Sequence, residues 1–333
     1  MTIAPSAHCP PPIAPVPAPR GLFGRGREWV ALARLLDQVE AGHSATLVLH
    51  GDLGAGKTTL LRHLQDHATG WRVVRTEGLE AARAVRLGGL RRLVGLGPHA
   101  PGAALTDRLA RAALREPVLC IVDDAHWLDR ESLCALAEAA WAIPHAAPVA
   151  MVFAHSAPGG LDALIGLREM AVGGLAERDA RVLLRSVLPC PLDARVEDRI
   201  VARTAGNALA LSELARWQAP DTLADALERC APPDLADLIA ASYRRRIERL
   251  PAITRRLLTM AAVDPCADPA RVWSAARPLG ANAAAVAAAN AAGILEFGHD
   301  LRFHHPLARA AALDAATAQE RHEAYRALRA VPV

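Results

Sequence analysis

The sequence predicts an α/β fold with a doubly wound parallel sheet, followed by helices and a short hairpin. Short apolar runs rich in β-branched residues alternate with segments whose apolar side chains recur at helical spacing, and this alternation is typical of parallel strands joined by helices. After about residue 175 the pattern of parallel strands stops, and helical patterns continue apart from a hairpin near residue 300. The expected strands are Ala45–His50, Arg72–Thr76, Val118–Asp123, Val149–Ala154 and a short fifth at Met170–Val172.

The chain begins with a proline-rich segment, residues 1–20. This composition is typical of a polyproline or disordered tail. The segment lacks the charged region followed by an apolar region that marks a secretion signal. A helix should follow, because apolar residues recur there at helical spacing: Trp29, Leu32, Leu35, Leu36 and Val39.

The first predicted strand leads into a glycine-rich loop, Gly51–Thr58, that fits the phosphate-binding pattern G-x-x-x-x-G-K-[ST]. Lys57 is the only lysine in the chain. A compact ammonium on a flexible stem suits a ring of backbone groups around phosphates better than a planar guanidinium does. A helix after the loop would direct its free N–H groups and positive dipole end toward the phosphates. The residues expected to bind nucleotide here are Gly51, Gly54, Ala55, Gly56, Lys57, Thr58 and Thr59.

The third predicted strand ends in two acidic residues, Asp123 and Asp124, as the second motif of a P-loop NTPase does. We expect Thr58 and Asp123 to hold Mg²⁺, Asp123 through the water shell of the ion. Lys57 and Asp124 are the candidate catalytic residues, with Lys57 neutralising the phosphates and Asp124 orienting or activating water. Asp129 is interpreted as the N-cap of the next helix.

These patterns divide the chain into four parts. The proline-rich tail, residues 1–20, precedes a P-loop NTPase core over residues 21–174. A helical lid should occupy residues 175–250, and a winged-helix-like unit with a C-terminal helix residues 251–333. The hairpin of that last unit is predicted from two apolar runs that flank a Gly-His-Asp turn at residues 298–300.

Composition excludes several classes of protein. The net charge of +3 is small and the arginine clusters lie on helical patterns, so direct DNA binding is not expected. No uncharged apolar run reaches the length of a membrane span. The six cysteines show no C-x-x-C pairing, which predicts no zinc site and no disulfide framework, and indicates a reducing cytoplasm.

Several motifs together resemble one family. They are Leu22–Arg25 with Glu28, the glycine-rich loop, and the stretch Val122–Asp129. This combination resembles the STAND-class ATPases, and in particular the AAA-type ATPase module of the large ATP-binding LuxR-type transcriptional regulators. Thr204–Leu211 and Phe303–Leu307 are similar as well, so the resemblance covers about residues 21–330.

The resemblance implies a switch controlled by ATP and ADP. In such proteins ADP holds a closed, inactive form, whereas an inducer and ATP favour an open form that self-associates. Gly24 and Arg25 would lie near the base or ribose, and His305 would contact the phosphates. For His305 a plain helix-end histidine is the alternative.

The sequence departs from the family pattern at two positions in the expected site. Ala208 replaces the proline of the Gly-Asn-Pro lid motif, which affects the contact between lid and nucleotide. His155 stands where the family carries an arginine that senses the γ-phosphate. A histidine could substitute only when protonated, so slow hydrolysis is expected. The helical-repeat region and the DNA-reading helix-turn-helix of these regulators have no counterpart in the 333 residues.

The sequence therefore favours a Mg²⁺-dependent, slowly hydrolysing ATPase switch of a LuxR-type regulator in the cytoplasm, with an inducer or regulator as partner. Two alternatives remain open. One is a non-hydrolysing module that assembles with a regulator or biosynthetic partner. The other is an initiator-like ATPase whose winged unit binds DNA.

Overall fold

The computed structural model describes residues 22–93, 105–145, 147–156, 159–188, 192–215, 235–264, 268–297 and 301–331. The predicted tail, residues 1–20, and the predicted turn of the hairpin, residues 298–300, lie outside the described residues. So does the end of the third lid helix, which was expected to reach Trp217.

The core of the fold is a five-stranded parallel sheet with the order β2-β3-β4-β1-β5. Every residue of β3 and β4 is buried, because helices cover both faces. The predicted α/β fold class is confirmed, and the strand ends differ by at most one residue from those expected. The strands are β1 (Ala45–His50), β2 (Arg72–Glu77), β3 (Val118–Asp123), β4 (Val149–His155) and β5 (Glu169–Ala171).

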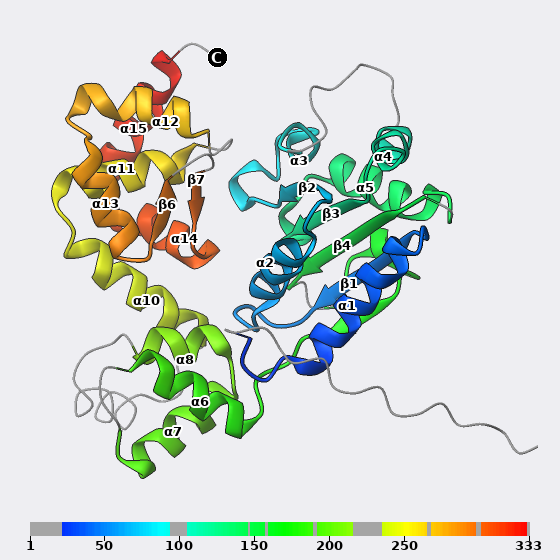
Figure 1. Cartoon of the computed structure of the whole chain (residues 1–333). Coiled ribbons are helices and arrows are strands. Elements are labelled where there is room, and N and C mark those ends of the chain that lie inside the picture. The colour runs from blue at the N-terminus through cyan, green and yellow to red at the C-terminus, as the bar shows by residue number, and fades with distance from the viewer. Residues whose placement is uncertain are drawn as a thin grey trace, which may run out of the picture.

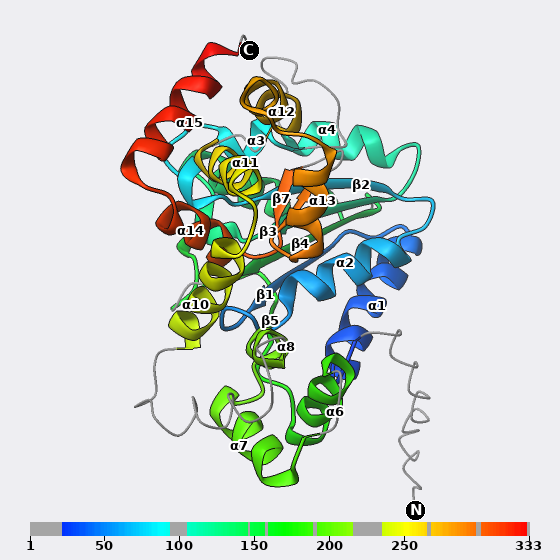
Figure 2. The same cartoon turned by 90° about the vertical axis from the view of Figure 1, so that its left-hand side faces the viewer.

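The two faces of the sheet bury different helices (Figure 2). Leu47 and Leu49 of β1 pack with α1 (Gly26–Glu40) and α2 (Lys57–His67). Val48 points to the opposite face, as the two-residue period of a strand requires. That face packs against the remaining helices of the core: α3 (Gly88–Arg91), α4 (Leu105–Ala113) and α5 (Arg130–Ala142). Three short 3₁₀ turns complete this part: η1 (Glu80–Ala82), η2 (Ala125–Trp127) and η3 (Asp162–Leu164).

Two further groups of helices follow the sheet, each with a buried cluster, and α8 (Ala208–Ala215) contributes to both clusters (Figure 1). The first consists of α6 (Glu177–Val187), α7 (Ala194–Thr204) and α8 (Ala208–Ala215). The second, here called the C-terminal unit, consists of α10 (Leu235–Glu248), α11 (Ala252–Val263), α12 (Pro269–Ala276), η4 (Arg277–Leu279), α13 (Ala283–Ala291), β6 (Leu295–Phe297), β7 (Leu301–Phe303), α14 (Pro306–Ala315) and α15 (Ala318–Ala330).

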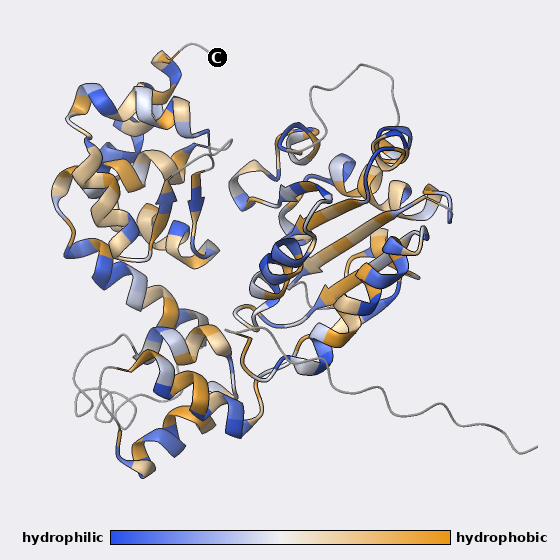
Figure 3. Cartoon of the chain, in the orientation of Figure 1, coloured by the Kyte–Doolittle hydropathy of each residue, from blue (hydrophilic) through white to orange (hydrophobic). Residues whose placement is uncertain are grey.

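Strands β6 and β7 pair antiparallel, which confirms the predicted hairpin. The winged-helix assignment and the domain limits stay predictions. Colouring by hydropathy shows hydrophobic strands in the central sheet and helices with mixed faces (Figure 3). No helix in the described part of the chain is both long and apolar enough to span a membrane.

Asp129 fixes the start of α5, as predicted. One carboxylate oxygen accepts from the Ser132 N–H at 3.0 Å and the Leu87 N–H at 2.9 Å, and the other from the Gly89 N–H at 2.9 Å. Burial alone would raise the pKa of Asp129, but these hydrogen bonds outweigh burial and hold the pKa below its usual range. Asp129 therefore joins α5 to α3 behind the carboxyl end of β3.

We expect Asp129→Ala to lower the free energy of unfolding by about 3 kcal/mol, because it removes an N-cap and orphans two further amides. Asp129→Asn keeps one acceptor oxygen and should lose about 1 kcal/mol. Urea denaturation followed by circular dichroism measures both. Equal stability of Asp129→Ala and the wild type would contradict this role.

Candidate nucleotide-binding site

The glycine-rich loop lies between the end of β1 and the start of α2. A Cβ atom on Gly51 would lie 2.1 Å from the carbonyl oxygen of Val172, so only glycine fits. Gly56 precedes α2 with a φ of 99°, in the left-handed region that favours glycine. These two positions let the loop curl over the N-terminus of α2, where free N–H groups can meet a phosphate.

Lys57 is buried at the start of α2, with 6% of its surface exposed. Its ammonium group donates to the carbonyl oxygens of Gly51 at 2.7 Å and Asp52 at 2.8 Å. Burial lowers the pKa of Lys57, while Asp124, Asp123 and Asp52 oppose that shift. An ammonium has three N–H bonds, so one remains to reach a phosphate oxygen while two hold the side chain.

The proposed metal ligands lie next to each other. The Thr58 hydroxyl donates to one carboxylate oxygen of Asp123 at 3.3 Å. This contact is compatible with an ion bound directly by the Thr58 hydroxyl and through a water molecule of its shell by Asp123. The described residues contain no group of three or more His, Cys, Asp and Glu side chains that could hold a metal. A Mg²⁺ ion here would therefore depend on water and nucleotide oxygens as well.

Asp124 directly follows β3 in an unusual backbone conformation, with a φ of 46°. A non-glycine residue in the left-handed region costs about 1 kcal/mol and is common at functional sites. Burial raises the pKa of Asp124 well above its usual value, and the charges of Asp123 and Glu77 add to the shift. A carboxyl group with a raised pKa is a stronger base once it has lost its proton.

A cavity of about 330 Å³ joins the loop to both following groups of helices. It brings together Arg25, His305, Asp124 and the loop residues 54–59. Gly51 and Asp123 do not line it but contact Lys57 and Thr58, which do. The structure thus gathers the predicted site residues around one space.

The lid helices rest on the loop through Asn207. Its side-chain N–H donates to the Leu53 carbonyl at 2.7 Å, and the Leu209 N–H donates to the Gly54 carbonyl at 3.1 Å. Ala208 lines the cavity between these two contacts. The lid therefore meets the loop even though the family's proline is missing.

Arg25 is buried and also binds the loop. Its guanidinium donates to the carbonyl oxygens of Ala55 at 2.7 Å and Gly173 at 2.6 Å, and to the carboxylate of Glu28 at 2.8 Å. These contacts hold the loop against the segment after β5. Its expected contact with a base or ribose stays a prediction.

His305 is the N-cap of α14, which confirms the helix-end reading. Its Nδ1 atom accepts from the Leu307 N–H at 3.1 Å, and its ring stacks on Tyr243 with centroids 6.3 Å apart. Burial and the nearby charge of Lys57 lower the pKa of His305 to about 4. The ring also lines the cavity, so its contact with a phosphate stays a prediction.

His155 ends β4 at the position of the family's arginine. It is buried beside His50, with ring centroids 6.1 Å apart. Burial, followed by the charges of His50 and Lys57, lowers the pKa of His155 below its usual 6.5. The surroundings of His155 thus favour the neutral imidazole over the positively charged form.

Three charged residues of the site were missed at the sequence level. Arg75 binds the second carboxylate oxygen of Asp123 at 3.2 Å, and Arg302 of β7 binds Glu77 at 3.2 Å. Glu77 lies beside Asp123 in the sheet register. Glu77 could have been predicted from the sequence, because it stands at the carboxyl end of β2. The approach of Arg302 could not, because it depends on how the hairpin packs.

Comparisons with known proteins agree with this geometry. Residues 21–152 match the family model of the AAA ATPase domain. Among solved structures, the chain is similar to a signal transduction ATPase with numerous domains, a STAND protein with a tetratricopeptide repeat sensor, from Pyrococcus horikoshii. The two are 17% identical with a TM-score of 0.58, and the match covers 96% of this chain. This chain spans about half (46%) of that protein.

More distant similarities lead to replication proteins. The ORC1 protein of Aeropyrum pernix, solved in complex with DNA, is 18% identical over 89% of this chain and 93% of that chain, with a TM-score of 0.46. Cdc6p of Pyrobaculum aerophilum is 14% identical over 95% and 97%, with the same TM-score. No curated protein sequence matches the chain. Residues 21–152 thus match the model of an AAA ATPase domain, and the fold of the chain is like that of a STAND ATPase.

The pKa of His305 makes stability depend on pH. In the unfolded chain the imidazole titrates near 6.5 and in the folded chain near 4, so the unfolded state binds more protons between these values. The contribution of the neutral His305 to the free energy of unfolding is fully present above its pKa in the unfolded chain. Through this residue, the free energy of unfolding should therefore fall by about 2 kcal/mol from pH 7 to pH 5.

His305→Gln removes the titrating group but keeps an acceptor for the Leu307 N–H. Between pH 7 and pH 5 its free energy of unfolding should therefore fall by about 2 kcal/mol less than that of the wild type. Urea denaturation at pH 5 and pH 7 measures the difference. Identical pH dependence in the wild type and His305→Gln would show that the folded histidine is not shielded.

Proposed function

We propose that this protein is a nucleotide-dependent switch, which binds ATP or ADP with Mg²⁺ and hydrolyses ATP slowly. One observation carries the proposal: a single cavity is lined by the glycine-rich loop, the lid helix α8 and the residues after β7. A nucleotide in this cavity would contact three parts of the chain at once. Its phosphates could then favour one arrangement of those parts over another.

The roles of the residues follow from their positions. Lys57 would neutralise the phosphates, the loop residues 54–59 would supply backbone N–H groups, and Thr58 with Asp123 would hold Mg²⁺. When bound, the ion would offset the developing negative charge on the phosphates. Asp124 would orient the attacking water, since its raised pKa makes it a usable base.

Slow turnover is proposed because the end of β4 carries a neutral histidine instead of an arginine. An arginine at the transferred phosphate can be worth about 10³ to 10⁵ in rate. Arg62 and Arg302 also line the cavity, and Arg302 comes from the C-terminal unit. Its ion pair with Glu77 would have to open before it could serve a phosphate.

We extend the proposal to signalling. The fold agrees with that of a STAND ATPase, and the motifs resemble those of LuxR-type transcriptional regulators, so an inducer or regulator and self-association in the ATP state are the expected partners. Cys120 and Cys134 are free thiols in the described chain, which supports a reducing cytoplasm as the compartment. We do not expect this chain to bind DNA directly.

A second candidate is an assembly module that binds nucleotide without turnover. Two observations favour it. His155 is neutral where a positive charge is needed, and the raised pKa of Asp124 leaves a larger fraction of it protonated. Turnover distinguishes the two candidates.

Calorimetric titration should show ATP and ADP binding to the wild type in the presence of Mg²⁺ and at least a hundredfold weaker binding to Lys57→Ala. The reason is that the buried ammonium is the main positive charge in the loop, and charged hydrogen bonds contribute about 1.5–3 kcal/mol each. Arg34→Ala, which removes an exposed positive charge from α1, is the matched control and should bind like the wild type. Unchanged affinity in Lys57→Ala would refute the site.

Asp124→Asn should retain nucleotide affinity within a few-fold and lose ATP turnover by about 10² to 10⁴, as expected for loss of a positioned base. Phosphate release under saturating MgATP measures it, and removal of Mg²⁺ by chelation should abolish turnover as well. A wild type that binds ATP but releases no phosphate would support the assembly module instead.

A further inference from the structure

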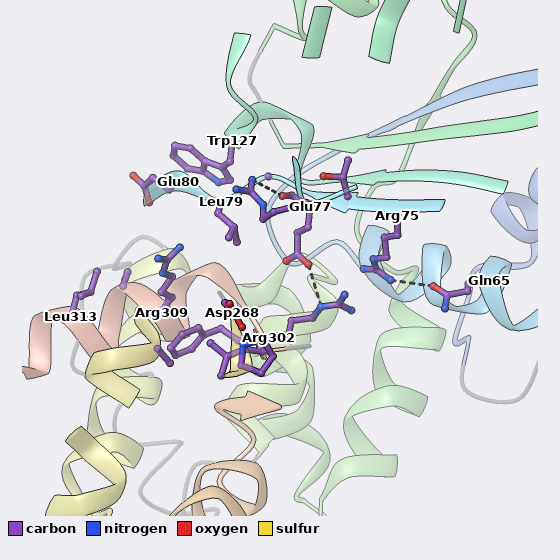
Figure 4. A pocket seen from close by; sticks show the side chains of 18 of the residues that line it. Gln65, Arg75, Glu77, Leu79, Glu80, Trp127, Asp268, Arg302, Arg309 and Leu313 are labelled. Atoms are coloured by element: carbon purple, nitrogen blue, oxygen red, sulfur yellow. Dashed lines mark hydrogen bonds and ion pairs between the residues drawn. The ribbon is translucent and has the colours of Figure 1, made fainter. Parts of the chain in front are cut away.

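A second and larger cavity, of about 720 Å³, lies between the sheet and the C-terminal unit (Figure 4). One wall comes from β2, η1 and the Trp127 turn. The other comes from β7, α14 and the N-terminal end of α12. Among the described residues, the ion pair between Glu77 and Arg302 joins the two walls.

Apolar and aromatic side chains make up part of both walls. Leu79 and Trp127 belong to the sheet side, and Figure 4 shows them above the side chains of the C-terminal unit. Leu301, Phe303 and Leu313 belong to the opposite side. A cavity of this size and lining suits a small organic molecule with an apolar or aromatic body.

Arginines from the two walls also face each other. Arg75 and Arg92 line the side of the sheet, and Arg302 and Arg309 line the side of the C-terminal unit. The Nε atom of Arg75 is buried and makes no hydrogen bond.

Two of these arginines form ion pairs with acids, Arg75 with Asp123 and Arg302 with Glu77, each at 3.2 Å. Arg309 instead donates to the backbone carbonyl oxygens of Ala262 and Asp264. Asp268 caps α12 by accepting the Ala270 N–H at 2.9 Å. Glu80 is exposed at the edge of the cavity. Like charges on opposite walls oppose closure, and an anion between them would turn that repulsion into attraction.

We propose that this cavity binds a small organic anion, a carboxylate or phosphate ester on an apolar or aromatic body, which bridges the sheet and the C-terminal unit. The site is distinct from the nucleotide cavity, although Glu77, Arg302 and Phe303 line both. Binding at one site should therefore change affinity at the other by the same factor in both directions. The proposal rests on the cavity and its charges, not on ATP turnover.

The test uses the fluorescent probe 1-anilinonaphthalene-8-sulfonate, an anion with an aromatic body, titrated into the full chain with saturating MgADP. The ADP blocks the nucleotide cavity. Arg92→Gln should weaken the probe about tenfold, the loss of one charged hydrogen bond, whereas Glu80→Gln should strengthen it. Arg91→Gln is the matched control, because Arg91 is the exposed neighbour of Arg92 and does not line the cavity.

A cavity-filling variant covers the case in which Arg92→Gln does not fold. Ala310 lines this cavity and not the nucleotide cavity, so Ala310→Phe should abolish probe binding and leave ADP affinity within a few-fold. Displacement by benzoate or by phenyl phosphate then identifies the preferred anionic group, with benzylamine as a cation of similar size.

Two results would overturn the proposal. One is probe binding that is unaffected by Arg92→Gln and Ala310→Phe alike. The other is displacement by benzylamine as effective as that by the two anions. If the chain fails to bind ADP, the same titrations without nucleotide, repeated in Lys57→Ala, test this cavity alone, so that failure of the nucleotide site and failure of this one are separable.

Discussion

The structure depends on the carbonyl groups of the glycine-rich loop. Lys57 donates hydrogen bonds to the carbonyl oxygens of residues 51 and 52. From the lid, the Asn207 side chain donates to the carbonyl of residue 53 and the Leu209 N–H to that of residue 54. Arg25 donates to the carbonyl of residue 55. The Ala55 N–H donates to the Asp52 carbonyl oxygen at 3.2 Å, and N–H groups at the start of α2 lie where a phosphate could accept from them. The loop is therefore the anchor for the lid as well as the proposed ligand-binding element.

The charges of the nucleotide cavity are arranged unevenly. Positive charge comes from Lys57, at the start of α2, and from arginines outside the usual position at the end of β4. At that position burial lowers the pKa of His155, which favours the neutral imidazole. On the proposed function, a γ-phosphate would be recognised partly by Arg302 of the C-terminal unit, once its ion pair with Glu77 has opened. Such an arrangement would favour sensing of the nucleotide over rapid hydrolysis.

The two cavities share a wall, and this links the proposed ligand site to the proposed switch. Glu77 ends β2 next to Asp123 and binds Arg302 from the hairpin. Burial, and next the charge of Asp123, raises the pKa of Glu77, whereas Arg302 and Arg75 oppose the shift. An added anion or a bound metal would disturb this balance, so occupancy on either side would alter how firmly the hairpin holds the sheet.

The sheet, the glycine-rich loop and the start of α5 could be predicted from the sequence. The apolar runs indicated the strands, the motif around Lys57 predicted a phosphate site, and Asp129 was recognisable as an N-cap, because all these signals are carried by neighbouring residues. The ion pairs of Arg75 with Asp123 and of Arg302 with Glu77, and the second cavity beside the first, could be found only in the folded structure. These contacts join residues far apart in the chain, and their geometry is set by how whole elements pack, which no local pattern encodes.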